Sequence, residues 1–283
     1  MISHGQLQLQ HINCDLNTTT HIKISDDSSN LYSPTGKMAS DKVVVVTGSS
    51  RGIGLGLVQE YAKRGWQVVA TCRNPDNAHQ LKTLAKDHLN IKVMACDIES
   101  TESIVNCLSA IRSAGICQVD LLINNAGVSN KDHPNDPAHK TDRDEFVSIF
   151  NTNVAGPLAV TQAMASLLEA SADPVVLNIS SRLGSISSVD KCTTTSYQCS
   201  KAALNMLTRC QADAYPNIKM LSVNPGWIAT DMGTKAMVAG YNKGKKPPTL
   251  LQDSVDGIAV IAATAGSKKS GSFWDYSGTE MPF

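Results

Sequence analysis

Residues 43–54 read VVVVTGSSRGIG, and this stretch decides the fold. Four β-branched residues in a row predict a buried strand, and the glycines after them predict a tight turn into a helix. The backbone N–H groups and the positive end of such a helix converge on one point, which suits a pyrophosphate. The spacing, G-x-x-x-G-x-G, departs from the dinucleotide fingerprint G-x-G-x-x-G. We nevertheless expect the turn to bind a cofactor through Gly48, Ser50, Arg51, Gly52, Ile53 and Gly54.

Outward from this stretch, short apolar runs alternate with helical patterns. The predicted strands cover residues 43–47, 66–72, 91–95, 120–124, 175–180 and 220–223. Such alternation indicates βαβ units with right-handed crossovers. The prediction is one α/β catalytic domain over residues 41–283, a Rossmann-type doubly wound parallel sheet of about seven strands with helices on both faces. Two polar segments, 129–144 and 233–252, are expected to be long loops beside the ligand-binding edge, the second as a lid over the substrate.

The composition excludes several classes of protein. Twenty-five Lys and Arg residues balance 25 Asp and Glu residues, so the long-range field of a nucleic-acid binder or membrane-surface protein is missing. The sequence contains no run of 18 apolar residues, so no membrane span is predicted. The eight cysteines contain no C-x-x-C pair, so no metal site is predicted, and we expect reduced thiols in a cytoplasmic protein. Cys192 and Cys199 could also pair.

The amino-terminal segment differs from the rest of the chain. Residues 1–37 hold no Arg, two Lys, three Asp and nine Ser or Thr, without a sustained apolar face. This composition predicts a disordered extension over residues 1–40. Met38, just before the first strand, is a plausible alternative start. Targeting to an organelle stays open, although a transit peptide should carry Arg and avoid acids.

The residues after the second predicted strand indicate which dinucleotide binds. An acidic residue there would hold the free ribose hydroxyl of NAD, but this chain has Cys72 and Arg73. Arg73 and Arg51 could both bind a 2′-phosphate, which favours NADP(H); the alternative is two solvated surface arginines. Asp97, with its neighbour Ile98, is assigned to the adenine end of the cofactor. A helix N-cap is an alternative role for Asp97.

A second group of residues predicts the chemistry. Asn125, Ala126 and Gly127 end the fourth predicted strand, where the strand order should reverse and a cleft should open. Tyr197 and Lys201 are four residues apart, so a helix presents both on one face. A nearby ammonium lowers the cost of ionising a phenol. By itself this pair could equally be a surface packing pair.

Taken together, TGSSRGIG, NNAG, a Ser at the end of a strand, YxxxK and Asn224-Pro225-Gly226 occur in the order typical of one family. From about Asp41 to the end, the chain resembles the non-extended short-chain dehydrogenases/reductases, and most closely the C-factor and sniffer-type carbonyl reductases. The resemblance implies Tyr197 as general acid toward a carbonyl oxygen and Lys201 as the group that lowers its pKa and holds the nicotinamide ribose. It further implies that Ser181 polarises the carbonyl and that Asn153 holds a water linked to Lys201.

The remaining positions also follow from the resemblance. Ser181 and Tyr197 are sixteen residues apart where the family has about thirteen, so Ser185 stays open as a competitor. Beyond the glycine turn, the cofactor would contact Arg73, Asp97, Ile98, Asn125, Ala126, Gly127, Tyr197, Lys201, Pro225, Gly226, Ile228 and Thr230. Trp227 and Met232 could add an apolar wall to the substrate site.

These residues predict an NADPH-dependent reductase that transfers a hydride to an aldehyde or ketone. Two alternatives stay open: a non-catalytic cofactor-sensing or signalling protein of the same fold, and an NAD-dependent alcohol dehydrogenase. The expected partner is a small carbonyl or alcohol, with no nucleic acid and no membrane. The resemblance also leads us to expect a homodimer or homotetramer.

Overall fold

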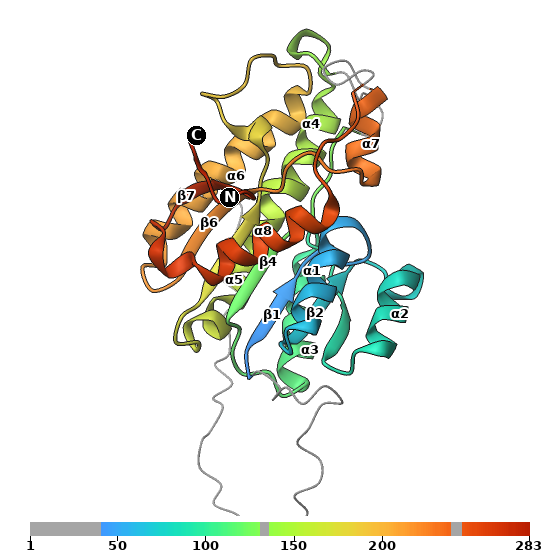
Figure 1. Cartoon of the computed structure of the whole chain (residues 1–283), viewed down its shortest axis with the longest axis vertical. Coiled ribbons are helices and arrows are strands. Elements are labelled where there is room, and N and C mark those ends of the chain that lie inside the picture. Colours follow the sequence, from blue (N-terminus) through green and yellow to red (C-terminus); the bar gives the residue numbers. More distant parts are fainter. Residues whose placement is uncertain (1–40, 131–135, 239–244) are drawn as a thin grey trace, which may run out of the picture. The chain divides into compact units, whose positions relative to one another are not determined.

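The computed structural model describes residues 41–130, 136–238 and 245–283. The predicted disordered extension over residues 1–40 lies outside this part of the chain. The strands are β1 (Val43–Val46), β2 (Gln67–Cys72), β3 (Ile91–Ala95), β4 (Leu121–Asn124), β5 (Val175–Ile179), β6 (Lys219–Asn224), β7 (Ser272–Asp275) and β8 (Glu280–Met281). They form one sheet in the order β3-β2-β1-β4-β5-β6-β7-β8 (Figure 1).

Helices connect the parallel strands. They are α1 (Gly52–Lys63), α2 (His79–Asp87), α3 (Thr101–Ser113), α4 (Arg143–Phe150), α5 (Gly156–Glu169), α6 (Thr195–Ala214), α7 (Asp231–Val238) and α8 (Leu251–Ala263). Short 3-10 turns lie at η1 (Pro75–Asn77), η2 (Ala138–Lys140), η4 (Arg182–Gly184) and η6 (Ala265–Ser267), and a π-helical turn, η3 (Asn151–Ala155), joins α4 to α5.

Each face of the sheet carries its own hydrophobic core, because successive strand residues point to opposite faces. Val44 and Val46 of β1 pack with α1, α2 and α8. Val43 and Val45 pack on the other face with α3 and α5. Both faces are covered, which is why the strands are continuous apolar runs rather than alternating ones. The doubly wound α/β fold is confirmed.

The position where the strand order reverses is next to β1. This strand pairs with β2 on one side and with β4 on the other, and both pairings are parallel. The connections from β1 and from β4 therefore leave in opposite directions, and a crevice opens at the carboxyl ends of these strands. The glycine turn after β1 and the NNAG segment after β4 meet there.

The predicted count of about seven strands is confirmed, and the bounds of the two predicted loops are corrected. The sheet has seven parallel strands and also an eighth, β8, which runs antiparallel to β7. Only four residues separate β7 from β8, too few for a crossover, so a hairpin is the available connection. The predicted loop 233–252 begins inside α7, and the predicted loop 129–144 ends inside α4. Gly233 lies in α7 at a position where a Cβ would overlap the carbonyl oxygen of Ile228, so only glycine fits there.

Candidate active site

The glycine turn is built so that backbone, not side chains, faces the crevice. Gly48 has φ +67°, and a Cβ there would lie 2.7 Å from the Cα of Ala126. At Gly54 a Cβ would lie 2.3 Å from the carbonyl oxygen of Gly48. Larger residues are therefore excluded at both positions, which explains the spacing that departs from the dinucleotide fingerprint.

The NNAG segment holds this turn from the neighbouring strand. The side-chain amide of Asn125 donates to the carbonyl oxygens of Thr47 (2.8 Å) and Gly48 (3.2 Å). In return, the Thr47 hydroxyl accepts hydrogen bonds from the backbone N–H groups of Asn125 and Ala126, both at 3.0 Å. Residues 47–48 and 125–126, 78 positions apart, thus form one rigid unit at the switch point of the sheet.

The amino terminus of α1 is open. Its N-cap residue, Arg51, makes no side-chain capping hydrogen bond, and the first turn contains no acidic residue. The first amides of a helix have no partners within the helix, so this end offers donors and a partial positive charge to an anion. The geometry fits the pyrophosphate of a dinucleotide.

The two arginines at this end differ in their surroundings. Arg73 is exposed directly after β2, where the prediction placed it. Arg51 is also exposed, but its guanidinium lies 3.3 Å from the carboxylate of Asp231, the first residue of α7. The sequence analysis did not find this ion pair, because nothing in the spacing of residues 51 and 231 indicates that they meet.

The residues assigned to the adenine end lie after β3. The helix-cap alternative for Asp97 is wrong, because Ser100 is the N-cap of α3 and accepts from the N–H of Ser103. Asp97 instead accepts a hydrogen bond from the N–H of Glu99 in a local turn. The side chain of Ile98 is buried, with its Cδ1 only 2.7 Å from where a Cβ on Gly156 would lie. Any contact between Ile98 and a cofactor would therefore come from its backbone.

The segment after β6 reaches the glycine turn from the other side of the crevice. Gly226 has φ +82°, and a Cβ there would lie 2.8 Å from Thr249 and from Tyr276. Ile228 is buried and forms an isolated bridge with Thr249. The methyl group of Thr230 would lie 3.4 Å from a Cβ on Gly52. Residues Pro225 to Thr230 thus lie across the turn, as the resemblance implies.

Tyr197 and Lys201 lie on α6, one turn apart. The Lys201 ammonium is 5.7 Å from the centroid of the Tyr197 ring and donates a 2.8 Å hydrogen bond to the carbonyl oxygen of Ile179, at the end of β5. It is also near Gly127, where a Cβ would lie 3.6 Å from the Lys201 Nζ. The surface-pair alternative is therefore wrong, because Lys201 is only 5% exposed and reaches between strand ends.

Burial sets the proton affinity of both groups. It lowers the pKa of Lys201 to about 8. It also raises the pKa of Tyr197, and the hydrogen bond with Ser181 partly offsets that rise. The upward direction differs from the lowering that the sequence predicted from Lys201 alone. The reason is that burial of the phenol is the larger effect and outweighs the lowering by Ser181.

The position of the two candidate serines separates their roles. The Ser181 hydroxyl is in hydrogen-bonding contact with Tyr197 and caps η4 by accepting from the N–H of Leu183. Ser185 is fully buried, and its hydroxyl donates to the carbonyl oxygen of Pro282 at 2.8 Å. Ser181 is therefore beside the phenol, whereas Ser185 fastens the carboxyl-terminal segment.

Asn153 lies in the π-helical turn η3. Its side chain accepts from the N–H of Val128 (2.8 Å) and donates to the Val128 carbonyl (2.9 Å) and to the Ser200 hydroxyl (2.9 Å). Ser200 in turn donates to the carbonyl oxygen of Tyr197 at 2.7 Å. Through these bonds Asn153 joins the segment after β4 to α6. A π-helical turn often marks such a functional position.

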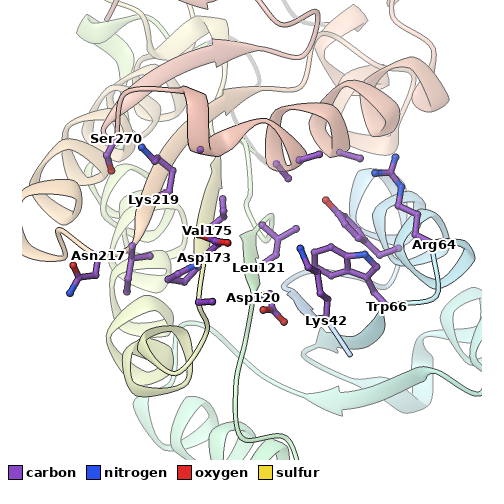
Figure 2. A pocket seen from close by; sticks show the side chains of 18 of the residues that line it. Lys42, Arg64, Trp66, Asp120, Leu121, Asp173, Val175, Asn217, Lys219 and Ser270 are labelled. Carbon is purple, nitrogen blue, oxygen red and sulfur yellow. The ribbon is translucent and has the colours of Figure 1, made fainter. Parts of the chain in front are cut away.

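Other candidate sites lie away from this crevice. A hollow of about 520 Å³ opens at the opposite edge of the sheet, among the amino ends of the strands (Figure 2). Leu121 and Val175, which line it, begin β4 and β5, whereas the residues above lie where strands end. Among the described residues, no group of three or more His, Cys, Asp or Glu could hold a metal ion. Cys192 and Cys199 are free thiols and do not pair with each other.

Comparison with known proteins identifies the family. A model of the short chain dehydrogenase family matches residues 42–239. The chain belongs to the short-chain dehydrogenases. This family assignment makes the protein an oxidoreductase. In the part of the chain that the structure describes, no helix is both long and apolar enough to span a membrane.

Three relatives show where this short-chain dehydrogenase lies within the family. The NADPH-bound carbonyl reductase from chicken fatty liver is 31% identical with a TM-score of 0.77, covering 86% of this chain and 99% of that one. The carbonyl reductase Sniffer of Drosophila melanogaster is 29% identical with a TM-score of 0.75, at the same coverage. The C-signal of Myxococcus xanthus is 35% identical over 167 residues, 58% of this chain and 93% of that protein. The predicted resemblance to C-factor and sniffer-type reductases is confirmed.

Proposed function

We propose that this chain is an NADPH-dependent reductase of aldehydes or ketones, with Tyr197 as the general acid. One observation carries the proposal: the Tyr197 phenol lies in contact with the Ser181 hydroxyl and one helical turn from the buried Lys201 ammonium. Two hydroxyl donors side by side suit an oxygen on which negative charge develops. The similarity to two carbonyl reductases, one of them NADPH-bound, supports the same reaction and cofactor.

In this mechanism Ser181 and Tyr197 hold the carbonyl oxygen between their hydroxyl groups. Bound NADPH would supply the hydride to the carbonyl carbon. Tyr197 transfers its phenolic proton to the oxygen as the new C–H bond forms, so the product is a neutral alcohol. The raised pKa of Tyr197 keeps the phenol protonated at neutral pH, the state that a general acid requires. Lys201, whose pKa of about 8 leaves it mostly charged at neutral pH, stabilises the phenolate that remains.

The residues of the cofactor end fit NADPH. The uncapped amino terminus of α1 would hold the pyrophosphate, and the exposed Arg73 would bind the 2′-phosphate. Arg51 is a second candidate for that phosphate, at the expense of its ion pair with Asp231. The glycine turn, Asp97, Ile98, residues 125–127 and residues 225–230 would line the rest of the cofactor.

Three further expectations stay predictions: a cytoplasmic location, a catalytic domain over residues 41–283, and a homodimer or homotetramer.

A titration of the purified chain with NADPH and with NADH, followed by fluorescence, tests the cofactor. We expect NADPH to bind more tightly, and Arg73→Ala to weaken NADPH about 10- to 100-fold while NADH is unaffected, because only NADPH carries the phosphate. Arg143→Ala is the matched control, since Arg143 is an exposed arginine paired with its neighbour Asp144 on α4. A preference for NADH that persists in Arg73→Ala would favour an NAD-dependent alcohol dehydrogenase.

Turnover is tested with a panel of aldehydes, ketones and diketones. We expect NADPH oxidation with some of them, and a loss of about 10²- to 10⁴-fold in kcat for Tyr197→Phe with NADPH affinity retained. The similarity to the C-signal favours a second candidate, a signalling protein that keeps the cofactor site. Under that function the biological effect survives Tyr197→Phe, and the panel gives no turnover.

A further inference from the structure

Asp136 is a buried carboxylate that the proposed mechanism does not use. It follows the loop after β4, is 1% exposed, and lies against the amino terminus of α6, some 60 positions later in the chain. Its Oδ2 accepts three hydrogen bonds: from the N–H of Ser196 (2.9 Å), from the Ser196 hydroxyl (2.6 Å) and from the side-chain amide of Asn130 (3.0 Å). The sequence analysis assigned this segment only to a polar loop.

These contacts replace the N-cap that α6 lacks. The N-cap residue of α6, Thr194, provides no side-chain hydrogen bond to the first amides. Asp136 provides two bonds: its carbonyl oxygen accepts from the N–H of Thr195 (2.9 Å), and its carboxylate accepts from the N–H of Ser196. A third backbone bond, from the N–H of Asp136 to the Thr193 carbonyl (2.7 Å), fixes the same register. The first two helical residues are therefore held by a distant residue rather than by a local cap.

The charge of Asp136 suits this place. Burial raises its pKa, but the hydrogen bonds led by those from Ser196 outweigh that effect and keep the pKa below its usual value. An ionised carboxylate at a helix amino terminus is also favoured by the helix dipole. Hydrogen bonds to a charged acceptor are stronger than neutral ones, so the anchor is firm.

Tyr197 is the next residue after Ser196. Its carbonyl oxygen is held by Ser200, which Asn153 holds in turn, and its hydroxyl meets Ser181. On its amino-terminal side, Thr195 and Ser196 are the residues that bond to Asp136. We propose that Asp136 is a positioning residue, which fixes the first turn of α6 so that the Tyr197 hydroxyl stays beside Ser181. This inference rests on the proposed reductase function, because it assigns Asp136 a role in that reaction.

Asp136→Asn tests the proposal, with Asp142→Asn as the matched control. Asp142 is also a carboxylate that accepts two backbone N–H bonds at a helix amino terminus, but it is exposed and both bonds come from α4. We expect Asp136→Asn to lower kcat about 10- to 100-fold, the effect of a small misplacement of a reacting group, while KM for NADPH changes less than about twofold. Asp142→Asn should leave both constants unchanged.

Amide hydrogen exchange provides a readout that needs no turnover. We expect exchange at residues 195–199 to accelerate about tenfold in Asp136→Asn and to stay unchanged in Asp142→Asn, because the amino-terminal anchor of α6 weakens only in the first. Asp136→Ala should enlarge both effects, since Asn still offers a neutral acceptor. Unchanged kcat, a parallel loss of kcat in both Asn variants, or unchanged exchange at residues 195–199 would overturn the proposal.

The two readouts also separate this proposal from the proposed function. If the wild-type chain reduces no carbonyl, the reductase function fails, and the catalytic role of Asp136 fails with it. Exchange then decides the structural half alone: acceleration confined to the first turn of α6 supports the anchor, and its absence refutes it. If the wild type is active and Asp136→Asn is as active as the wild type, the positioning role alone is wrong.

Discussion

The amino termini of α1 and α6 face the same crevice but are built in opposite ways. At α1 no side chain caps the helix, no acid lies in the first turn, and the glycine turn brings backbone close to the open amides. At α6 the protein supplies its own anion, the buried carboxylate of Asp136. An open terminus can accept a ligand's phosphate, whereas a filled one holds a side chain in place. The comparison separates a binding end, made of the glycine turn and the start of α1, from a chemical end, made of the start of α6 with Tyr197, Lys201 and the neighbouring Ser181.

Ser181→Ala should strongly impair the chemical end. We expect kcat to fall about 100-fold with NADPH affinity within twofold, because the lost hydroxyl would meet the substrate oxygen and not the cofactor. Ser185→Ala is the control, since its hydroxyl bonds to Pro282 and not to Tyr197. Steady-state kinetics of Ser181→Ala and Ser185→Ala measures the two changes in kcat. Equal losses of kcat would mean that Ser181 has no special place in the reaction.

Gly54→Ala should damage the binding end instead. A Cβ would lie 2.3 Å from the Gly48 carbonyl oxygen, so the backbone must shift. This shift would distort the glycine turn that is proposed to bind the cofactor's phosphates. We expect NADPH affinity to fall at least about tenfold, together with a stability loss of about 1–3 kcal/mol.

Gly115→Ala provides the matched control for the binding end. Gly115 also has a positive φ, +80°, but nothing lies within 4 Å of its Cβ position, so only backbone strain is added. Its stability should fall by about 1 kcal/mol with NADPH affinity unchanged. Fluorescence titration and thermal unfolding measure both. Normal NADPH binding by folded Gly54→Ala would contradict the assignment of this turn.

Lys201 makes stability at the chemical end depend on pH. Its pKa falls from 10.5 in the unfolded chain to about 8 in the fold, so between these values the unfolded state binds more protons. Stability attributable to Lys201 must therefore rise with pH across this window, by about 3 kcal/mol in total. Below pH 8 the buried ammonium carries the full penalty. The difference in unfolding free energy between wild type and Lys201→Met, measured from pH 7 to 10.5, should show this rise; a constant difference would refute it.

Asp231→Asn should give the smallest effect, again at the binding end. The Arg51–Asp231 ion pair is exposed on both sides, so it is worth at most about 1 kcal/mol. Releasing Arg51 should tighten NADPH binding by no more than about fivefold and leave NADH binding unchanged. The titration should be repeated at high salt, where wild type and variant should converge. Weaker NADPH binding in Asp231→Asn would mean that the pair supports the site rather than competing with the phosphate.

Much of the binding end could be predicted because its residues are contiguous. A strand, a glycine turn and a helix within 21 residues determine their own geometry, and positive φ values at Gly48 and Gly52 leave glycine as the favoured residue. The bounds of the predicted loops were less accurate, since local composition does not show where a helix begins or ends. Gly233 is unfavourable in a helix by propensity, yet it lies inside α7 at a position where close contact with Ile228 leaves no room for a side chain.

The sequence by itself determined the doubly wound sheet, the glycine turn and the one-turn spacing of Tyr197 and Lys201, because each depends on neighbours within a few residues. The tertiary structure decided what surrounds those groups. It placed Ser181 rather than Ser185 beside the phenol, buried Lys201, paired Arg51 with Asp231 and brought Asp136 to the start of α6. Contacts between residues that are well separated in the chain leave no period or motif in it, so only folding brings such partners together.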